Sequence, residues 1–188
     1  MDPLDALLRS KETFTATLRE VAPDDWERAT PCPAWDVRAL LNHVIGGNVR
    51  YTMLIRGGAA EALAPTRTMD HVGENPRASF SQTFKIMYGA FAAPGALGVI
   101  THHPSGDRSG RELLAMRVME QAVHGWDLAR AIGADETIDA DVAQFLLSVD
   151  ELISNGQRDG FYSAVDEIPT GLTDQDRLLY LVGRKVRP

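Results

Sequence analysis

Several features that would place a protein outside the cytoplasm are missing from this sequence. Cys32 is the single cysteine, so no intramolecular disulfide can form, which is typical of a reducing compartment. No stretch approaches the roughly 18–20 apolar residues that span a bilayer. The start, MDPLDALLRS, lacks the cationic segment of a signal peptide. We therefore expect a cytoplasmic protein that does not bind membranes.

Positive charge is also scarce. The chain carries 19 Lys and Arg against 26 Asp and Glu, a net charge of −7. Such a balance argues against a broad electrostatic surface for nucleic acid or anionic lipid. The 44% hydrophobic content is ordinary for a globular protein. A chain of 188 residues suits one domain, and we expect a single domain over 1–188.

Common catalytic signatures are absent as well. The sequence has no Walker loop, G-x-G-x-x-G, C-x-x-C, H-E-x-x-H or nucleophile elbow. These absences argue against nucleotide binding through such loops, a zincin-type peptidase and Ser-His-Asp chemistry. Cys32 lies between two prolines, and we interpret it as a small buried residue at a bend, although it could be reactive.

The apolar spacing is mostly helical, and strand signals are sparse. We expect an all-α fold, a helical bundle with one or two short extra helices, whose facing helices can build metal and cofactor sites. The segments 59–75 and THHPSGDRSG are expected to be irregular loops. Helices are predicted over about 3–21, 36–56, 76–91, 109–132 and 140–155, with a short one beginning near 173.

The helix predicted over 109–132 carries an acidic and an imidazole side chain on one face. Glu120 and His124 lie four residues apart in RVMEQAVHGWDLARAIG, and residues at this spacing are neighbours on a helix. Zinc bonds to imidazole and carboxylate are about 2.0–2.2 Å long, which one helical turn can satisfy. The alternative is a solvated or hydrogen-bonded pair. Asp127, one turn further, could orient a ligand or be a plain charge near the helix end.

A third ligand is available in LLNHVIGG. His43 lies beside an apolar stripe, where a histidine is more often a hydrogen-bonded core residue. Gly46 and Gly47 follow it, and each glycine costs about 1 kcal/mol relative to alanine inside a helix. They leave space that a bound group could fill, or they permit close helix packing. His43, Glu120 and His124 together match the three-ligand pattern of catalytic zinc sites.

Three other histidines have weaker patterns. His102 and His103 lie in the loop before Pro104 and are rival ligands, and His71 has no pattern around it. Arg50, Arg77 and Arg117 could each bind an acidic substrate, and each could equally be a surface charge.

Two motifs resemble those of a known family. TPCPAWDVRALLNHVIGGN is similar to the amino-terminal signature of the mycothiol-dependent maleylpyruvate isomerase-like proteins, a branch of the DinB/YfiT-like metalloenzymes, and MEQAVHGWDLARAIG to their second signature. The closing DRLLYLVGR resembles the tail of a short actinobacterial subgroup described as metal-binding. The isomerases carry a further carboxy-terminal domain, whereas about 55 residues follow Gly133 here.

The resemblance implies an up-down-down-up four-helix bundle with one divalent metal on His43, Glu120 and His124. It also implies a small thiol, mycothiol, as co-substrate, which adds to a cis double bond and is eliminated after rotation. Zinc is the expected metal, and nickel and iron(II) also suit two histidines and a carboxylate. Asp127, Gly47 and His103 are expected around the metal.

Three functions stay open at this point. The first is a thiol-dependent isomerase or S-transferase that acts on a small electrophile. The second is a metal-dependent hydrolase, for which Asp127 or His103 would be the general base. The third is a non-catalytic metal or small-molecule binding protein, with the metal shell closed by His102 or His103. Homodimers are common among such bundles, but no sequence signal indicates one.

Overall fold

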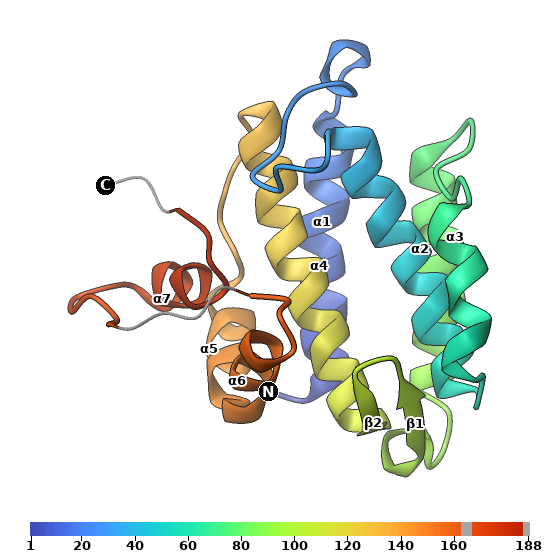
Figure 1. Cartoon of the computed structure of the whole chain (residues 1–188). Helices are drawn as coiled ribbons and strands as arrows, with labels where there is room; N and C mark the ends of the chain where they lie inside the picture. The colour runs from blue at the N-terminus through green and yellow to red at the C-terminus, as the bar shows by residue number, and fades with distance from the viewer. Residues whose placement is uncertain (163–166, 186–188) are drawn as a thin grey trace.

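Four long helices form the body of the protein (Figure 1). The computed structural model describes residues 1–162 and 167–185, apart from the side chain of Asp150. Helix α1 packs along α4, α2 packs along α3, and α2 also contacts α4. The predicted all-α four-helix bundle is confirmed. The four helices are α1 (Pro3–Glu20), α2 (Val37–Ile55), α3 (Pro76–Phe91) and α4 (Gly110–Ile132).

The helix ends follow local sequence signals. Asp2 accepts a hydrogen bond from the backbone N–H of Leu4, and Asp36 accepts one from Ala39. Ser109 and Glu112 form a reciprocal capping box at the start of α4. Gly133 ends α4 with a left-handed φ of 75°, which glycine adopts without a steric penalty. The predicted starts and stops of these helices are therefore confirmed to within a residue or two.

Helix α4 runs through the centre of the fold. Its side chains are buried on nearly every side, which is why the apolar pattern of this helix is broad. Polar residues on a helix of this kind must find partners inside the protein or line a cavity. The apolar core of the protein includes Leu7, Phe14, Leu18, Leu40, Leu41, Val44, Phe80, Met87, Leu113, Val118 and Leu146.

The expectation of a loop over THHPSGDRSG was wrong. The strands β1 (Ile100–His103) and β2 (Gly106–Ser109) pair as an antiparallel hairpin, with His102 opposite Asp107. Gly106 takes a φ of 110°, which allows the tight reversal. The hydroxyl of buried Thr101 donates to the carbonyl of Arg108 at 2.9 Å. Composition gave no sign of a hairpin because the strands are short and polar.

Short 3₁₀ helices occupy parts of the links. They are η1 (Pro23–Asp25), η2 (Ala60–Thr68) and η3 (Ala96–Gly98). Helix η2 lies within the segment 59–75 that was expected to be irregular, and it packs on α2. The expectation for this segment was therefore wrong in part.

The carboxy-terminal part folds back beside α4, on the side away from α2 and α3 (Figure 1). One helix was predicted over 140–155, but the chain breaks at Val149 into α5 (Ala140–Ser148) and α6 (Asp150–Arg158). The last helix, α7 (Asp174–Leu181), is capped by Thr173, as the sequence predicts. Among the described residues, no helix is long and apolar enough to cross a membrane.

Candidate functional site

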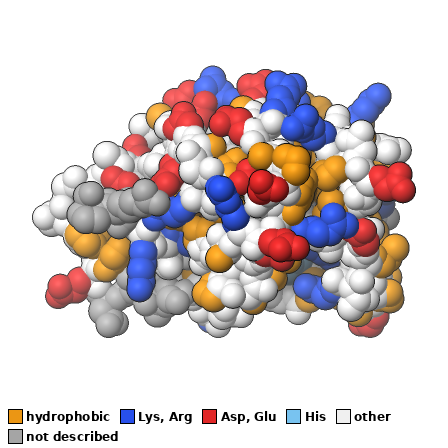
Figure 2. All heavy atoms as spheres, turned by 90° about the horizontal axis from the view of Figure 1, so that it is seen from above, with side chains coloured by type: hydrophobic (Ala, Val, Ile, Leu, Met, Phe, Trp, Pro, Cys, Tyr) orange, Lys and Arg blue, Asp and Glu red, His pale blue; other side chains and the backbone are white. Residues whose placement is uncertain are grey.

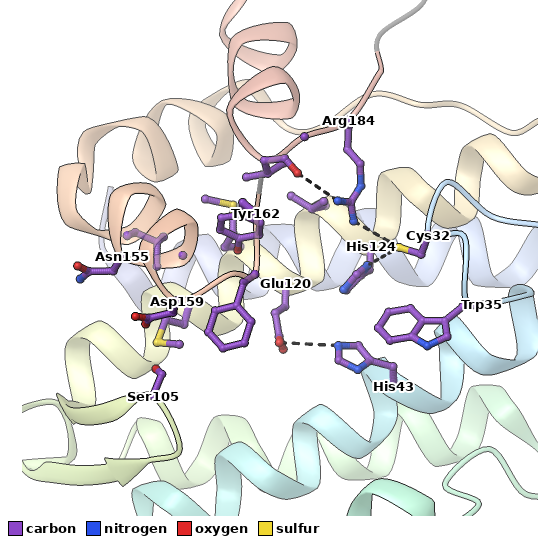
Figure 3. A pocket seen from close by; sticks show the side chains of 18 of the residues that line it. Cys32, Trp35, His43, Ser105, Glu120, His124, Asn155, Asp159, Tyr162 and Arg184 are labelled. Atoms are coloured by element: carbon purple, nitrogen blue, oxygen red, sulfur yellow. Dashed lines mark hydrogen bonds and ion pairs between the residues drawn. The ribbon is translucent and has the colours of Figure 1, made fainter. Parts of the chain in front are cut away.

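A cavity of about 1630 Å³ opens beside α4, between the bundle and the carboxy-terminal part (Figure 3). Its wall comes from the loop 29–35, from α2 and α4, from the β-hairpin, from α6 and from the tail 182–185. Ligand pockets in proteins commonly measure about 300–1,000 Å³, so this space exceeds the needs of one small molecule. On the face drawn in Figure 2, acidic and basic side chains are interspersed, and hydrophobic side chains gather near the middle.

The three predicted metal ligands line the same cavity, and two of them, His43 and Glu120, lie close together. His43 Nε2 and Glu120 Oε1 lie 3.8 Å apart, and the rings of His43 and His124 lie 5.1 Å apart at nearly a right angle. Ligand atoms about 2.1 Å from a tetrahedral ion lie roughly 3.4 Å from each other. The spacing of His43 and Glu120 is therefore near that of two ligands of one ion. Figure 3 shows Glu120 pointing toward His43, with His124 beside them.

Glu120 is held by a buried guanidinium. Arg117, whose side chain is fully buried, donates from Nη1 to Glu120 Oε2 at 2.9 Å. Its Nη2 donates to the carbonyl of Val44 and to Asn48 Oδ1, which ties α4 to α2. Burial acts to raise the pKa of Glu120, but His43, Arg117 and His124 outweigh it and hold the pKa well below its usual range. Glu120 is therefore a carboxylate with Oε2 engaged and Oε1 directed at His43.

The two glycines of α2 make room for arginines. A Cβ at Gly47 would lie 2.7 Å from Arg117 Nη1, and a Cβ at Gly46 would lie 2.7 Å from Arg50 Nη1 and 2.6 Å from the His71 ring. The space that the glycines leave is thus filled by side chains of the protein. Of the two alternatives left open by the sequence, close packing is the one observed, although the packed groups are polar.

His124 is oriented by a second acidic residue of α4. Its Nδ1 lies 2.9 Å from Asp127 Oδ2, so the other ring nitrogen, Nε2, is the one available to a ligand. Arg184, from the tail after α7, donates to Asp127 Oδ1 at 2.9 Å and to Oδ2 at 2.8 Å. The pKa of Asp127 falls to about 2, because hydrogen bonds and charge from His124 and Arg184 exceed the opposing effect of burial. Asp127 thus contacts the ring of His124, and its role in orienting a metal ligand stays a prediction.

Cys32 contacts both Asp127 and Arg184. Its thiol donates to Asp127 Oδ2 at 3.4 Å, and Arg184 Nη2 lies 3.4 Å from the sulfur. Burial, followed by the charge of Asp127, raises the pKa of Cys32 to about 12. The thiol is therefore neutral at physiological pH, which fits the interpretation of a residue at a bend and argues against a nucleophile.

The donor atoms of His43, Glu120 and His124 do not all lie within 4.8 Å of one another, but those of a different group do. In the part of the chain that the structure describes, Cys32, His124 and Asp127 form the group of three whose donor atoms all lie within 4.8 Å of one another. Both oxygens of Asp127 are already engaged by Arg184 and His124, and zinc requires the thiolate form of cysteine. The guanidinium of Arg184 therefore already supplies positive charge at this group.

The surroundings of His43 favour its neutral form. Trp35 stacks on the imidazole with ring centres 4.4 Å apart (Figure 3). Burial is the main cause that lowers the pKa of His43, and Glu120 opposes it only in part. Neutral imidazole is the form that binds metals.

The remaining candidate residues differ in whether they line the cavity. His103 lines the cavity, with Nδ1 at 2.8 Å from the Ser105 hydroxyl, whereas exposed His102 pairs with Asp107. Burial also lowers the pKa of His103. His71 contacts the Thr66 carbonyl, and Arg77 contacts the Arg19 carbonyl. Neither His71 nor Arg77 is among the residues that line the cavity.

Sequence reasoning missed three side chains that shape the site. Trp35 stacks on His43, Tyr162 covers part of the cavity wall, and Arg184 binds Asp127 from 57 residues away. The motif DRLLYLVGR ends at Arg184, so a signal existed, but nothing local to it indicates a partner on α4.

Comparison with known proteins identifies the family of this chain. Residues 7–129 match the family model described as the mycothiol maleylpyruvate isomerase N-terminal domain. The chain belongs to that family. Within the match lie His43, Glu120, His124 and Asp127, but not Arg184.

Full-length relatives and a solved structure extend the match beyond residue 129. Two uncharacterized proteins of Mycobacterium tuberculosis, from strains CDC 1551 / Oshkosh and ATCC 25618 / H37Rv, are each 30% identical over the whole of both chains. The crystal structure of the mycothiol-dependent maleylpyruvate isomerase is similar with a TM-score of 0.63 at 18% identity. The similarity covers 82% of this chain and 71% of that one, and it supports the fold.

Proposed function

We propose that the protein is a thiol-dependent isomerase or S-transferase that acts on a small electrophile, with one divalent metal held by His43, Glu120 and His124. The observation that carries the proposal is the position of these three side chains on the wall of the large cavity. Family membership and the likeness to a mycothiol-dependent maleylpyruvate isomerase support a thiol as co-substrate.

The chemistry of the donor set fits such a metal. Two imidazoles and a carboxylate suit zinc, and a metal held by three protein ligands would have a position free for a ligand. A bound metal would lower the pKa of a thiol or polarise a carbonyl group. The chain's own residues contribute orientation: Asp127 fixes the ring of His124, Arg117 fixes Glu120, and Trp35 packs on His43.

The state of Cys32 supports a thiol from outside the protein. Its thiol remains neutral and is hydrogen-bonded to Asp127, so it does not supply the nucleophile. In an isomerisation, the sulfur of the added thiol would bond to one carbon of a cis double bond, while the electron pair moves toward a conjugated carbonyl. Rotation about the resulting single bond and expulsion of the thiolate would give the trans product with no net consumption of thiol.

The hydrolase alternative has less support. A general base must be free to take a proton from water. Both oxygens of Asp127 are engaged, which leaves His103 as the candidate general base. We therefore place the thiol-dependent reaction first.

Elemental analysis of the untagged protein, followed by a thiol-transfer assay, tests the proposal. We expect about one zinc, nickel or iron per chain, lost in His43→Ala and in His124→Ala. We also expect mycothiol or cysteine to accelerate isomerisation or conjugation of a cis-enone acid in the wild type. Cys32→Ser is the control and should keep its activity. Absence of bound metal on purification and on titration would contradict the metal site, and absence of any thiol effect would contradict the reaction class.

A further inference from the structure

Five arginines line the cavity, and three of them have carboxylate partners. Arg108 pairs with Asp159 at 3.2 Å, Arg130 with Glu136 at 2.7 Å, and Arg184 with Asp127 at 2.8 Å. The other two, Arg50 and Arg67, form no ion pair with any residue that the structure describes. The two sets therefore differ in whether the protein itself supplies the counter-charge.

Arg50 is the unusual member, because it is buried. Its residue is 8% exposed, and the one hydrogen bond found for its guanidinium within residues 1–162 and 167–185 runs from Nη2 to the carbonyl of His43 at 3.1 Å. A guanidinium carries five N–H donors, so most of them lack a protein acceptor. Arginine is rarely buried without a paired charge, since removing the cation from water is costly.

The charges around Arg50 do not provide it with a free carboxylate partner. Burial lowers the pKa of Arg50; Glu120 acts against this, and Arg67 and Arg117 act with it. Glu120 is the carboxylate that acts on the pKa of Arg50, but its Oε2 accepts from Arg117 and its Oε1 faces His43. Arg67 is exposed at the cavity and adds a second cation without a partner among the described residues.

The backbone is adapted to the position of this guanidinium. Gly46 lies under Arg50, where a Cβ would come within 2.7 Å of Nη1. The hydrogen bond to His43 ties the guanidinium to the residue that we place at the metal. Arg50 is thus fixed beside the reaction site and has donors to spare.

We propose that Arg50, assisted by Arg67, forms an anion subsite of the cavity that binds a carboxylate group of the ligand. The planar guanidinium fork matches a carboxylate, to which it can donate two parallel hydrogen bonds. The subsite deepens the proposed function. Its role in substrate binding rests on that function, since the electrophile would then be an acid whose reactive carbons lie near His43 and Glu120. Anion binding itself requires neither thiol nor turnover.

Calorimetric titration with succinate tests the subsite, because succinate is a dianion with no electrophilic carbon. The full-length protein is used as purified, with and without EDTA, and succinamide is the neutral comparison. We expect succinate to bind in both conditions, succinamide to bind at least about tenfold more weakly, and Arg50→Gln to lose about tenfold or more in succinate affinity. Higher salt should weaken the binding.

Arg108→Gln is the matched control, because Arg108 lines the same cavity but already pairs with Asp159. We expect its succinate affinity to stay within about twofold of the wild type. If Arg50→Gln fails to fold, Arg50→Lys replaces it. Lysine keeps the charge but loses the fork, so we expect an affinity between those of the wild type and the glutamine variant.

Four results would overturn the subsite: no succinate binding to the wild type, binding that EDTA abolishes, equal losses in the Arg50 and Arg108 variants, or binding of inorganic phosphate through Arg50 without binding of succinate. Each is independent of the thiol assay. Succinate binding that depends on Arg50, in a protein without thiol-dependent activity, would retain the subsite and contradict only the proposed reaction.

Discussion

Helix α4 carries two acids at the site, half-buried Glu120 and fully buried Asp127, which lie two turns apart and have different partners. Asp127 has both oxygens engaged, by His124 on its own helix and by Arg184 from the tail. Glu120 has one oxygen engaged by Arg117 and the other directed at His43 across the cavity wall. The difference indicates that Asp127 supports the site, whereas Glu120 is available to bind a ligand.

Metal affinity gives the most direct test of the difference between Glu120 and Asp127. We expect Glu120→Gln to weaken metal binding by more than about 100-fold, because a charged ligand is lost. Asp127→Asn should lose about 10–100-fold, the usual cost of removing a partner that orients a ligand. Competition with a chromogenic chelator measures both. Equal losses would mean that the two acids do not differ in role, and unchanged affinity in Glu120→Gln would remove Glu120 from the metal.

The support that Arg184 gives Asp127 can be tested by stability. Arg184→Ala leaves the fully buried carboxylate of Asp127 without its guanidinium, and we expect a loss of about 3 kcal/mol in the free energy of unfolding. Urea denaturation measures this loss. Adding Asp127→Asn to the same chain should recover part of it, since the unpaired charge is then gone. A loss under about 0.5 kcal/mol would show that the tail contact is only superficial.

The hold of Arg117 on Glu120 depends on Gly47. A Cβ at this position meets Arg117 Nη1, so we expect Gly47→Ala to cost about 1–3 kcal/mol and to weaken metal binding through Glu120. Gly89→Ala in α3 is the matched control, because nothing lies within 4 Å of its added Cβ. We expect that control to gain about 0.5–1 kcal/mol in thermal or urea unfolding. Gain of stability in both variants would contradict the packing argument.

A third acid of α4, Glu112, is exposed and serves as the reference for Glu120 and Asp127. Hydrogen bonds from the Ser109 side chain and backbone lower its pKa. Its contribution to stability is therefore present above the unfolded pKa near 4.3 and is lost as pH falls through the lower folded value. We expect Ser109→Ala to cost about 1 kcal/mol at neutral pH and less below about pH 4. Urea midpoints across pH measure this, and a cost that grows toward low pH would be contrary to the expectation.

How far the sequence could predict the site differs between its two acids. Glu120 and His124 lie on one helical face by spacing alone, and Asp127 follows one turn later, so their mutual placement is a local property of α4. Arg117 was also visible, but as a candidate for an acidic substrate. It is instead a fully buried residue that holds Glu120, because its guanidinium reaches Asn48 and Val44 on another helix.

Local sequence signals were enough to predict the four long helices, since caps such as Asp36, the Ser109–Glu112 box and Gly133 act within a few residues, and apolar periodicity marks the face that is buried. Which polar groups meet depends on packing between segments that are distant in the sequence. The hairpin beside the cavity, the filling of the space at Gly46 and Gly47, and the contact of Arg184 with Asp127 join segments far apart in the chain. Such contacts arise from packing, where a side chain takes whatever partner the folded chain brings within hydrogen-bonding distance.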